Sequence, residues 1–232
     1  MATSIKATSP YVVPKRNRFA RAVIRPIFRG LFQTLGRVQI QGLENIPRNG
    51  SYIIAINHLS IFDPPFVIAF WPYCPEAIGA VEIWSKPGQS QLARLYGGIQ
   101  VHRGEYDRQV LEKVLNALDA GRPVVIAPEG GRSHTPGLRK ANPGIAYIAE
   151  KAGVPVVPVG VVGSTDDFLQ QALHGKRPPI EMRIGSPFNL PPTRGKGEER
   201  RIARQKNADQ IMYQIAALLP PAYQGVYQRP EN

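Results

Sequence analysis

Short apolar runs alternate with amphipathic stretches along most of this chain. Residues 52–56, 124–127 and 156–162 are nearly continuous apolar runs of strand length, and residues 99–101 and 180–184 are shorter or weaker ones. Runs of this length, bounded by polar residues, indicate strands that are buried on both faces. They supply the strands of a predicted sheet.

Helical periodicity separates these runs. Apolar residues recur on one face between Asp107, a good N-cap, and Gly121, a good C-terminal stop. Residues 64–71 and 144–151 predict two further helices, and a last amphipathic helix runs to about residue 219. Strand and helix alternating in this way predict an α/β fold with a mixed, largely parallel sheet flanked by helices.

The N-terminal segment, residues 18–36, has a basic amphipathic pattern. On a helical wheel one sector holds Arg18, Arg21, Arg25 and Arg29, and the opposite sector holds Phe19, Val23, Ile24, Ile27, Leu31 and Leu35. This favours a helix lying in an anionic membrane surface. The alternative is a helix packed on its own protein with solvated arginines. Pro26 predicts a kink or a split.

The pattern divides the chain into three parts. Residues 1–37 form a flexible lead-in and a membrane-facing amphipathic helix, residues 38–220 one enzyme-sized domain, and residues 221–232 a tail. No apolar run is long enough to predict a transmembrane helix, and the arginines exclude a secretory signal. The single cysteine, Cys74, excludes an internal disulfide framework and any multi-cysteine metal site.

Charge points to an anionic partner. Lys and Arg outnumber Asp and Glu by 29 to 17, for a net charge of +12. Nucleic acid, an anionic membrane and phosphorylated substrates all fit such an excess. Eight basic residues and no acidic one occur up to Arg37, so the charge is concentrated in one arm. Because the charge is confined to this arm, and no basic segment with interspersed aromatic residues is present, the sequence argues against nucleic acid as the partner.

The first candidate for chemistry directly follows the first apolar run. His58 and Asp63 lie five positions apart, which on an ideal helix would separate them by about 140°. A bend near Pro64 and Pro65 would let them meet. A carboxylate that holds one ring nitrogen fixes the imidazole tautomer, so the other nitrogen can act as a base on an alcohol. A structural histidine is the alternative.

Two more clusters follow predicted strands. After residues 124–127 come Glu129, Gly130, Arg132 and Ser133, where glycine allows close backbone approach and the guanidinium suits phosphate. The alternative is a tight turn whose Glu and Arg pair with each other. Arg103 follows residues 99–101. Carboxyl ends of parallel strands share one edge of a sheet, so all these residues are expected to converge there.

In order and type these segments resemble the glycerolipid acyltransferase family, which contains lysophosphatidate and glycerol-3-phosphate acyltransferases. That family carries Asn-His-x4-Asp, a Gly-rich stretch ending in Arg, Glu-Gly-Thr-Arg-Ser, and a strand of the type Val-Pro-Val-Val-Pro-Val. The matching residues are Asn57, His58 and Asp63; Gly98 and Arg103; Glu129, Gly130, Arg132 and Ser133; and Pro155 and Pro158. The resemblance covers roughly residues 40–190.

The resemblance implies direct acyl transfer to a lysophospholipid hydroxyl, with 1-acylglycerol-3-phosphate as acceptor and phosphatidate as product. His58, oriented by Asp63, is the implied general base, and Arg103 and Arg132 bind phosphate while Glu129 positions the glycerol. The acyl donor is a thioester of coenzyme A or acyl carrier protein, and neither a cofactor nor a metal is implied. The implied location is the cytoplasmic face of the membrane, held peripherally or monotopically.

Two departures concern the acceptor. Gly131 replaces the family's Thr, and its basic Phe-Lys-Lys-Gly stretch reads Ala-Asn-Pro-Gly at residues 141–144, with Arg139 and Lys140 nearby as substitutes. Glycerol-3-phosphate or another lyso-lipid is therefore an alternative acceptor. Two rivals come from other classes. One is a non-catalytic protein that binds a membrane surface or anions, and the other is a metal-dependent hydrolase using His58, Asp63, Glu129 and His134.

Overall fold

The computed structural model describes residues 11–102, 104, 107–133 and 136–228. Within these residues one seven-stranded sheet has the order β1-β7-β6-β2-β5-β3-β4, and all neighbours are parallel except β6 and β7. The strands are β1 (Arg37–Gln41), β2 (Ile53–Ile56), β3 (Glu76–Ala80), β4 (Ile99–Val101), β5 (Val124–Ile126), β6 (Val156–Val162) and β7 (Pro179–Ile184). The predicted α/β fold with a mixed, largely parallel sheet is confirmed.

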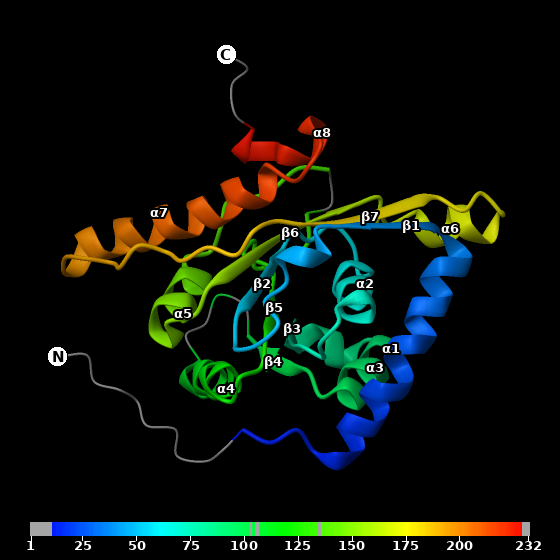
Figure 1. The fold of residues 1–232 in the computed structure, drawn as a ribbon, viewed down its shortest axis with the longest axis horizontal. Coiled ribbons are helices and arrows are strands. Elements are labelled where there is room, and N and C mark those ends of the chain that lie inside the picture. The colour runs from blue at the N-terminus through cyan, green and yellow to red at the C-terminus, as the bar shows by residue number, and fades with distance from the viewer. Residues whose placement is uncertain (1–10, 103, 105–106, 134–135, 229–232) are drawn as a thin grey trace.

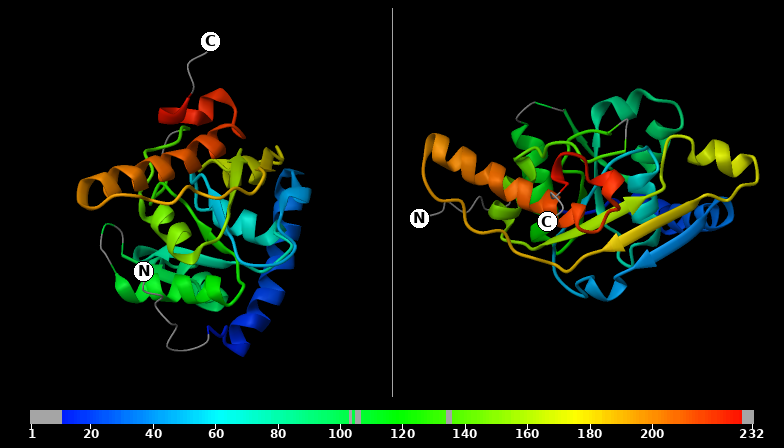
Figure 2. Two further views of the ribbon diagram at one scale, coloured as in Figure 1. Left: turned by 60° about the vertical axis from the view of Figure 1, so that its left-hand side comes forward. Right: turned by 90° about the horizontal axis from the view of Figure 1, so that it is seen from above.

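Helices cover both faces of the sheet (Figures 1 and 2). One layer contains α1 (Lys15–Leu35), α2 (Asp63–Phe70), α3 (Gln89–Tyr96) and α6 (Phe168–Leu173). The other contains α4 (Arg108–Asp119), α5 (Gly144–Ala152) and α7 (Gly197–Ala216). The result is a three-layer arrangement in which the central strands are buried on both sides.

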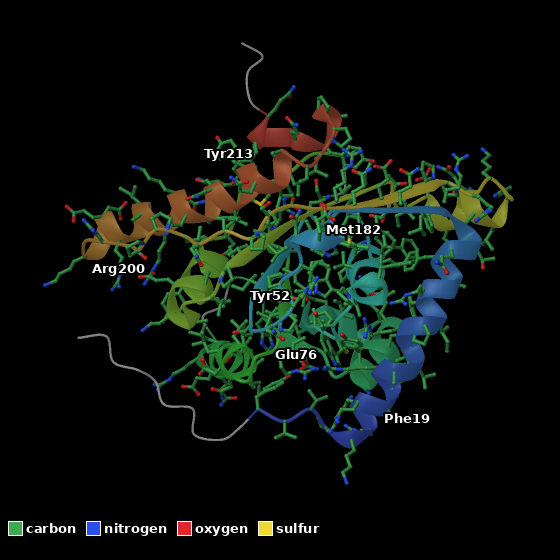
Figure 3. All side chains as sticks on the ribbon, viewed as in Figure 1. Phe19, Tyr52, Glu76, Met182, Arg200 and Tyr213 are labelled. Atoms are coloured by element: carbon green, nitrogen blue, oxygen red, sulfur yellow. The ribbon has the colours of Figure 1, made fainter. Side chains whose placement is uncertain are left out.

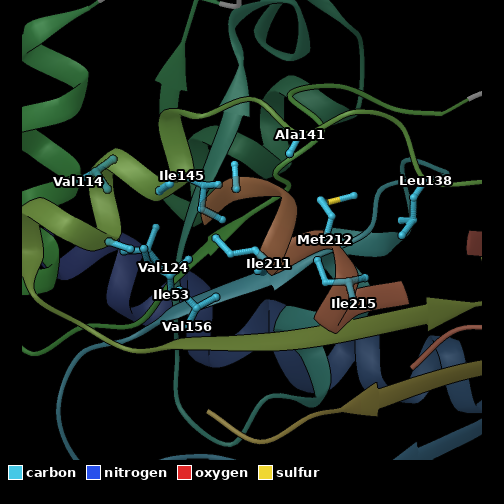
Figure 4. Packing of buried hydrophobic residues seen from close by; sticks show 14 of the residues in the cluster. Ile53, Val114, Val124, Leu138, Ala141, Ile145, Val156, Ile211, Met212 and Ile215 are labelled. Carbon is cyan, nitrogen blue, oxygen red and sulfur yellow. The ribbon is translucent and has the colours of Figure 1, made fainter. Parts of the chain in front are cut away.

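The two cores explain why the central strands read as continuous apolar runs. Ile53 and Ala55 of β2 face the core beneath α4, α5 and α7, whereas Ile54 and Ile56 face the core beneath α1 and α2. Figure 4 shows the first of these cores, where side chains from α4, α5 and α7 meet those of β2, β5 and β6. A strand between two helical layers needs apolar residues at every position, so its pattern does not alternate.

Most predicted elements are present, with shifted ends. The helix after Asp107 begins as expected, since the Asp107 carboxylate accepts the backbone N–H groups of Gln109 and Val110 at 2.8 and 3.1 Å. Strands β1 and β3 and helices α3 and α6 were not predicted from the sequence. β1 lies at the edge of the sheet with two apolar residues in five, and β3 begins with a buried Glu76.

Two prolines in an apolar strand suit an edge or a strand start. Pro155 does directly precede β6, but Pro158 lies within it, and β6 is inside the sheet between β7 and β2. Pro158 is tolerated there because pairing with β7 starts only at Val159. The predicted tail from residue 221 instead forms α8 (Pro221–Gln224) and η3 (Gly225–Tyr227). Tyr227 fixes this segment: its buried hydroxyl donates to Asp209 at 2.6 Å and accepts the Ala141 N–H at 2.9 Å.

Helix α1 is one uninterrupted helix with Pro26 inside it, rather than two. Three of its arginines, Arg21, Arg25 and Arg29, bind groups of the protein. The Arg25 Nε donates to the Ile68 carbonyl at 3.0 Å, and the Arg29 Nη2 donates to the Ala69 carbonyl at 2.8 Å. These are carbonyls from the last turn of α2, which have no partner within that helix. Cationic side chains are favourable there because the helix dipole is negative at that end.

The outer face of α1 is therefore the apolar one. Phe19, Val23, Ile27 and Leu31 are 74%, 42%, 59% and 49% exposed, and Phe19 lies at the margin of the molecule in Figure 3. Both sequence hypotheses had the arginines in solvent or against lipid headgroups, and for Arg21, Arg25 and Arg29 that was wrong. No helix in the described part of the chain is long and apolar enough to span a membrane.

Arg21 belongs to a buried ion cluster at the amino end of β3. Its guanidinium donates to both oxygens of Glu76, at 2.8 and 2.6 Å, and to the Tyr96 carbonyl at 2.7 Å. Arg122 also binds Glu76, and the Tyr11 hydroxyl donates to it at 2.9 Å. Glu76 is fully buried (Figure 3). Burial alone would raise the pKa of Glu76, but its bonds to Arg21 and the nearby arginine charges bring the pKa below its ordinary value.

Candidate active site

His58 and Asp63 meet at the carboxyl end of β2, as the sequence predicted. The His58 Nδ1 lies 3.0 Å from the Asp63 Oδ2. The carboxylate is fully buried, whereas the His58 side chain is 15% exposed, and no described residue binds its Nε2. The Asp63 contact leaves Nδ1 as the protonated nitrogen, so Nε2 is the free base.

The bend that brings the pair together is made by the loop between β2 and α2. Helix α2 starts at Asp63, so His58 lies outside it and the angular separation of an ideal helix does not apply. The Asp63 Oδ2 accepts the backbone N–H groups of Leu59 at 2.7 Å and Ser60 at 2.8 Å. The Asp63 carboxylate therefore holds the backbone of the loop that precedes it and also orients the His58 imidazole.

The Asp63 carboxylate has one more partner, Ser164, which was not predicted from the sequence. Ser164 is fully buried, and its hydroxyl donates to the Asp63 Oδ1. It follows β6 as His58 follows β2, so its place after an apolar strand was the available signal. Asn57 acts beside it: its side chain donates to the Val161 carbonyl at 2.8 Å and accepts the Val161 N–H at 2.7 Å. This ties the loop after β2 to the end of β6.

Glu129 supports the histidine from the opposite side. Its Oε1 accepts the His58 backbone N–H and its Oε2 accepts the Arg139 backbone N–H, each at 2.9 Å. Burial raises the pKa of the Glu129 carboxyl, and the two backbone hydrogen bonds oppose that rise. Both oxygens are thus engaged by the protein and the residue is 6% exposed. Its contact with substrate stays a prediction.

The turn after β5 places the remaining residues of this cluster. Gly130 has a φ of +67°, which a residue with a side chain rarely adopts, and its N–H closes the turn onto the Ala127 carbonyl at 3.1 Å. The Ser133 N–H then binds the His58 carbonyl at 2.7 Å. Residues 129–133 therefore wrap the main chain of His58.

Arg132 does not pair with Glu129, so the tight-turn alternative was wrong. Its Nη1 lies 3.7 Å from the Asp166 Oδ1, and its side chain is 25% exposed. Arg139, the suggested substitute for the family's basic stretch, donates from Nη1 to the Arg132 carbonyl at 2.9 Å. Two guanidinium groups therefore border the same turn, and both are suited to an anionic substrate group.

Two predicted residues lie outside the described part of the chain: Arg103, proposed to bind phosphate, and His134, which the metal hypothesis needed. Among the described residues no three His, Cys, Asp or Glu side chains are grouped so as to hold a metal ion. The described residues that carry chemistry at this end of the sheet are His58 and its two supporting carboxylates.

Known proteins resemble this chain in sequence and in fold. The model of the family described as Acyltransferase matches residues 37–162. A 1-acyl-sn-glycerol-3-phosphate acyltransferase of Borreliella burgdorferi is 26% identical over 140 residues, which are 59% of this chain and 56% of that protein. A chloroplastic protein of the same name from Brassica napus is 29% identical over 131 residues, 55% of this chain and 38% of that protein.

An uncharacterized protein of Mycobacterium tuberculosis is 25% identical over 169 residues, 65% of this chain and 44% of its own length. The chain thus spans about half the length of the curated relatives it matches. The crystal structure of a 1-acyl-sn-glycerophosphate acyltransferase, PlsC, from Thermotoga maritima superposes with a TM-score of 0.59 at 23% identity, covering 84% of this chain and 79% of that one. This likeness supports the fold.

Proposed function

Since the chain belongs to the Acyltransferase family, we propose that it moves a fatty acyl group from a thioester to the hydroxyl of a lysophospholipid. The family membership confirms the resemblance of the sequence motifs. The observation that carries the proposal is the His58–Asp63 contact of 3.0 Å beside an Nε2 that no described residue binds. The curated relatives named above suggest 1-acylglycerol-3-phosphate as the acceptor and phosphatidate as the product.

In the proposed mechanism, the His58 Nε2 removes the proton from the acceptor hydroxyl as its oxygen attacks the thioester carbonyl carbon. Asp63 holds the Nδ1 proton and stabilises the imidazolium that forms. When the tetrahedral intermediate collapses, the carbon–sulfur bond breaks and the thiol leaves with the proton that His58 had taken. The protein needs no nucleophile of its own, because the acceptor oxygen attacks directly.

We propose that the acceptor's phosphate binds near the turn after β5. Arg132 and Arg139 border it, and Arg103 joins them on the strength of the sequence motif alone. Gly130 and Ser133 shape this turn, whereas Glu129 holds the main chains of His58 and Arg139. The altered residues Gly131 and Asn142 lie in the same region, so glycerol-3-phosphate or another lyso-lipid is the alternative acceptor.

Release of free thiol by purified protein tests this function. With an acyl-CoA donor and lysophosphatidate, we expect turnover that His58→Ala lowers by about 10²–10⁴-fold, the usual contribution of a general base. His174→Ala is the matched control, because His174 is an exposed residue at the end of α6. Turnover by the His58→Ala variant at the wild-type rate would contradict the mechanism.

The choice of substrates follows from the same assay. Acyl-CoA and acyl carrier protein are offered as separate donors, and lysophosphatidate, glycerol-3-phosphate and a second lyso-lipid as separate acceptors. The rival of a non-catalytic anion-binding protein predicts no thiol release with any pair. It also predicts binding to anionic vesicles that disappears at high salt.

We further propose that α1 holds the enzyme at the membrane through its apolar face. Arg21, Arg25 and Arg29 are bound internally, so attachment depends on Phe19, Val23, Ile27 and Leu31 entering the lipid. Attachment of this kind resists salt, since burial of apolar area drives it. The cytoplasmic face of the membrane, predicted from the sequence, stays part of this proposal.

Cosedimentation with phospholipid vesicles tests the role of α1. Replacing both Ile27 and Leu31 with Ser removes two large apolar side chains, each worth about 1.5–3 kcal/mol when buried, so we expect binding to weaken by at least about tenfold. Leu173→Ser is the control, because Leu173 is 74% exposed on α6. Equal losses in the two variants would show that the apolar face of α1 is not the attachment surface.

A further inference from the structure

A groove lies between α1, β1 and the end of α2, away from the His58 site. Its volume is about 770 Å³. Val38, Ile40, Leu43 and Phe70 form an apolar wall, and Arg29, Arg37 and Arg177 also line it. No acidic side chain is among its lining residues. A groove that is apolar and carries uncompensated positive charge fits an amphiphilic anion.

The three arginines keep their charge uncompensated for different reasons. Arg29 donates to the Ala69 carbonyl, and its guanidinium lies 5.7 Å from the centre of the Phe70 ring. Arg177 donates from Nη2 to the carbonyls of Gln33 and Gly36 at 2.7 and 3.2 Å, closing the end of α1. The exposed Arg37 side chain has no hydrogen-bond or ion-pair partner among the described residues. Neutral carbonyls hold two of the charges without cancelling them.

The charges and the apolar wall are arranged along the groove. Arg37 starts β1, and its N–H binds the Pro178 carbonyl at 3.0 Å, so Arg37 and Arg177 lie at the same end. Ile40 lies roughly 10 Å from Arg37 along β1 at the usual rise of a strand, and Leu43 follows the left-handed turn at Gly42. An acyl chain whose phosphate lies at the arginine end would therefore run along the apolar wall.

Arg177 has an unusual backbone for its position. Its φ of +45° is the only positive value of a non-glycine residue in the described part of the chain. A left-handed conformation is unfavourable for a residue with a Cβ and persists only where the surrounding structure holds it. Here the conformation holds a guanidinium at the end of α1 and on the wall of the groove.

We infer that this groove binds one anionic membrane phospholipid, with its phosphate against Arg37 and Arg177 and one acyl chain along Val38, Ile40 and Phe70. The position agrees with the membrane attachment proposed for α1, because the groove starts on the same turns whose outer side exposes Ile27 and Leu31. The inference does not depend on acyl transfer, and the lipid bound here is neither donor nor acceptor.

The chain has a built-in reporter for this site. It contains two tryptophans, and the fully buried Trp71 is the chain neighbour of Phe70 and Pro72, which line the groove. In the Trp84→Phe variant, Trp71 is the only tryptophan, and lipids brominated in the acyl chain quench a tryptophan that they approach closely. Protein in detergent micelles doped with such lipids measures binding without requiring vesicle attachment through α1.

We expect brominated phosphatidylglycerol to quench Trp71 at least about threefold more than brominated phosphatidylcholine of the same chains. Arg37→Gln, made in the Trp84→Phe background, should abolish the difference. Arg37 suits this test because its side chain makes no hydrogen bond or ion pair with any described residue. Arg48→Gln, also an exposed arginine, is the control.

Three results would overturn the inference. Equal quenching by the two lipids would mean that the charge plays no part. Unchanged quenching in Arg37→Gln, with an unaltered unfolding midpoint, would place the lipid elsewhere. Displacement of the brominated lipid by an equal concentration of glycerol-3-phosphate would show that the groove takes a soluble phosphate and not a lipid.

Discussion

Glu76 and Asp63 are buried carboxylates at opposite ends of the sheet, and they differ in the kind of partner that binds them. Glu76 at the amino end of β3 is bound by Arg21 and Arg122, two permanent cations. Asp63 at the carboxyl end of β2 is bound by two backbone N–H groups, a serine hydroxyl and an imidazole. Both carboxylates are fully shielded from solvent.

The difference in partners makes the Glu76 site a structural ion cluster and the Asp63 site a support for the base His58. Around Glu76 the charge is cancelled and cannot be passed on, because arginine does not lose its proton. Around Asp63 the partners are neutral apart from His58, whose imidazole can take up and release a proton. The negative charge of Asp63 is therefore available to stabilise a proton on the imidazole when one arrives. The two ends should respond differently to removal of one carboxylate charge.

Asp63→Asn should give the largest effect, on rate. The amide keeps the size of the side chain but donates where the carboxylate accepted, so the imidazole takes the wrong tautomer. We expect thiol release to fall by about 10²–10⁴-fold. Steady-state kinetics with saturating donor and acceptor measure it, and chemical unfolding checks that the variant folds.

The comparison breaks if Asp63→Asn behaves like a structural change. If Asp63→Asn lost stability but kept the wild-type rate per folded molecule, the role of Asp63 would be structural, like that of Glu76. The outcome consistent with catalysis is a collapse of the rate constant per folded molecule, whatever the altered bonds to Leu59 and Ser60 cost in stability.

Glu76→Gln should give the second effect, on stability. Removal of one partner from a buried ion pair leaves Arg21 buried without its counter-charge, which costs about 3–5 kcal/mol. The free energy of unfolding by urea measures it, with Glu44→Gln as control because Glu44 is exposed. The rate per folded molecule should stay at the wild-type value, and a lower rate would show that the two ends are coupled.

The sequence revealed the carboxyl end of the sheet far better than the amino end. His58, Asp63 and the turn at Gly130 follow apolar runs directly, so each residue's place on the sheet edge could be inferred from the strand before it. Glu76 starts a strand that is weak in sequence, and its partners Arg21 and Arg122 come from segments 55 and 46 residues away. Such pairing depends on tertiary folding and leaves no local pattern.

Helix α1 shows how a correct periodicity gave the wrong orientation. The wheel separated arginines from apolar residues correctly, but the rule that charge faces water then failed. Arg25 and Arg29 instead donate to unpaired carbonyls at the end of α2. The sequence predicted the end of that helix only approximately, so these carbonyls could not be identified as partners. Ser164 was missed for the same reason, because its partner Asp63 lies 101 residues earlier.

A smaller effect comes from removing one hydroxyl at each end. Ser164→Ala deletes a hydrogen bond to Asp63, and Tyr11→Phe deletes one to Glu76. Each bond to a charged group is worth about 1.5–3 kcal/mol. We expect Ser164→Ala to lower the rate by about tenfold or more by loosening Asp63, whereas Tyr11→Phe should lower only the free energy of unfolding. Equal effects of the two variants on rate would remove the distinction between the ends.

The smallest effect should appear in the pH dependence of stability. Burial raises the pKa of Glu129, whereas the arginines bring the pKa of Glu76 below its ordinary value. A raised carboxyl pKa contributes stability below the unfolded value of about 4.3, and this contribution is lost as pH rises through the folded value. A lowered pKa contributes stability above that value, which is lost as pH falls through the folded one.

The two carboxyls should therefore give opposite slopes. The difference in unfolding free energy between wild type and Glu129→Gln should shrink as pH rises above the unfolded value of about 4.3. The difference between wild type and Glu76→Gln should instead shrink as pH falls below about 4. Urea unfolding across this range measures both, with Glu44→Gln as the flat reference. Parallel slopes would mean that Glu129, too, is held by opposite charge, and its role as a support for His58 through backbone amides would then have to be abandoned.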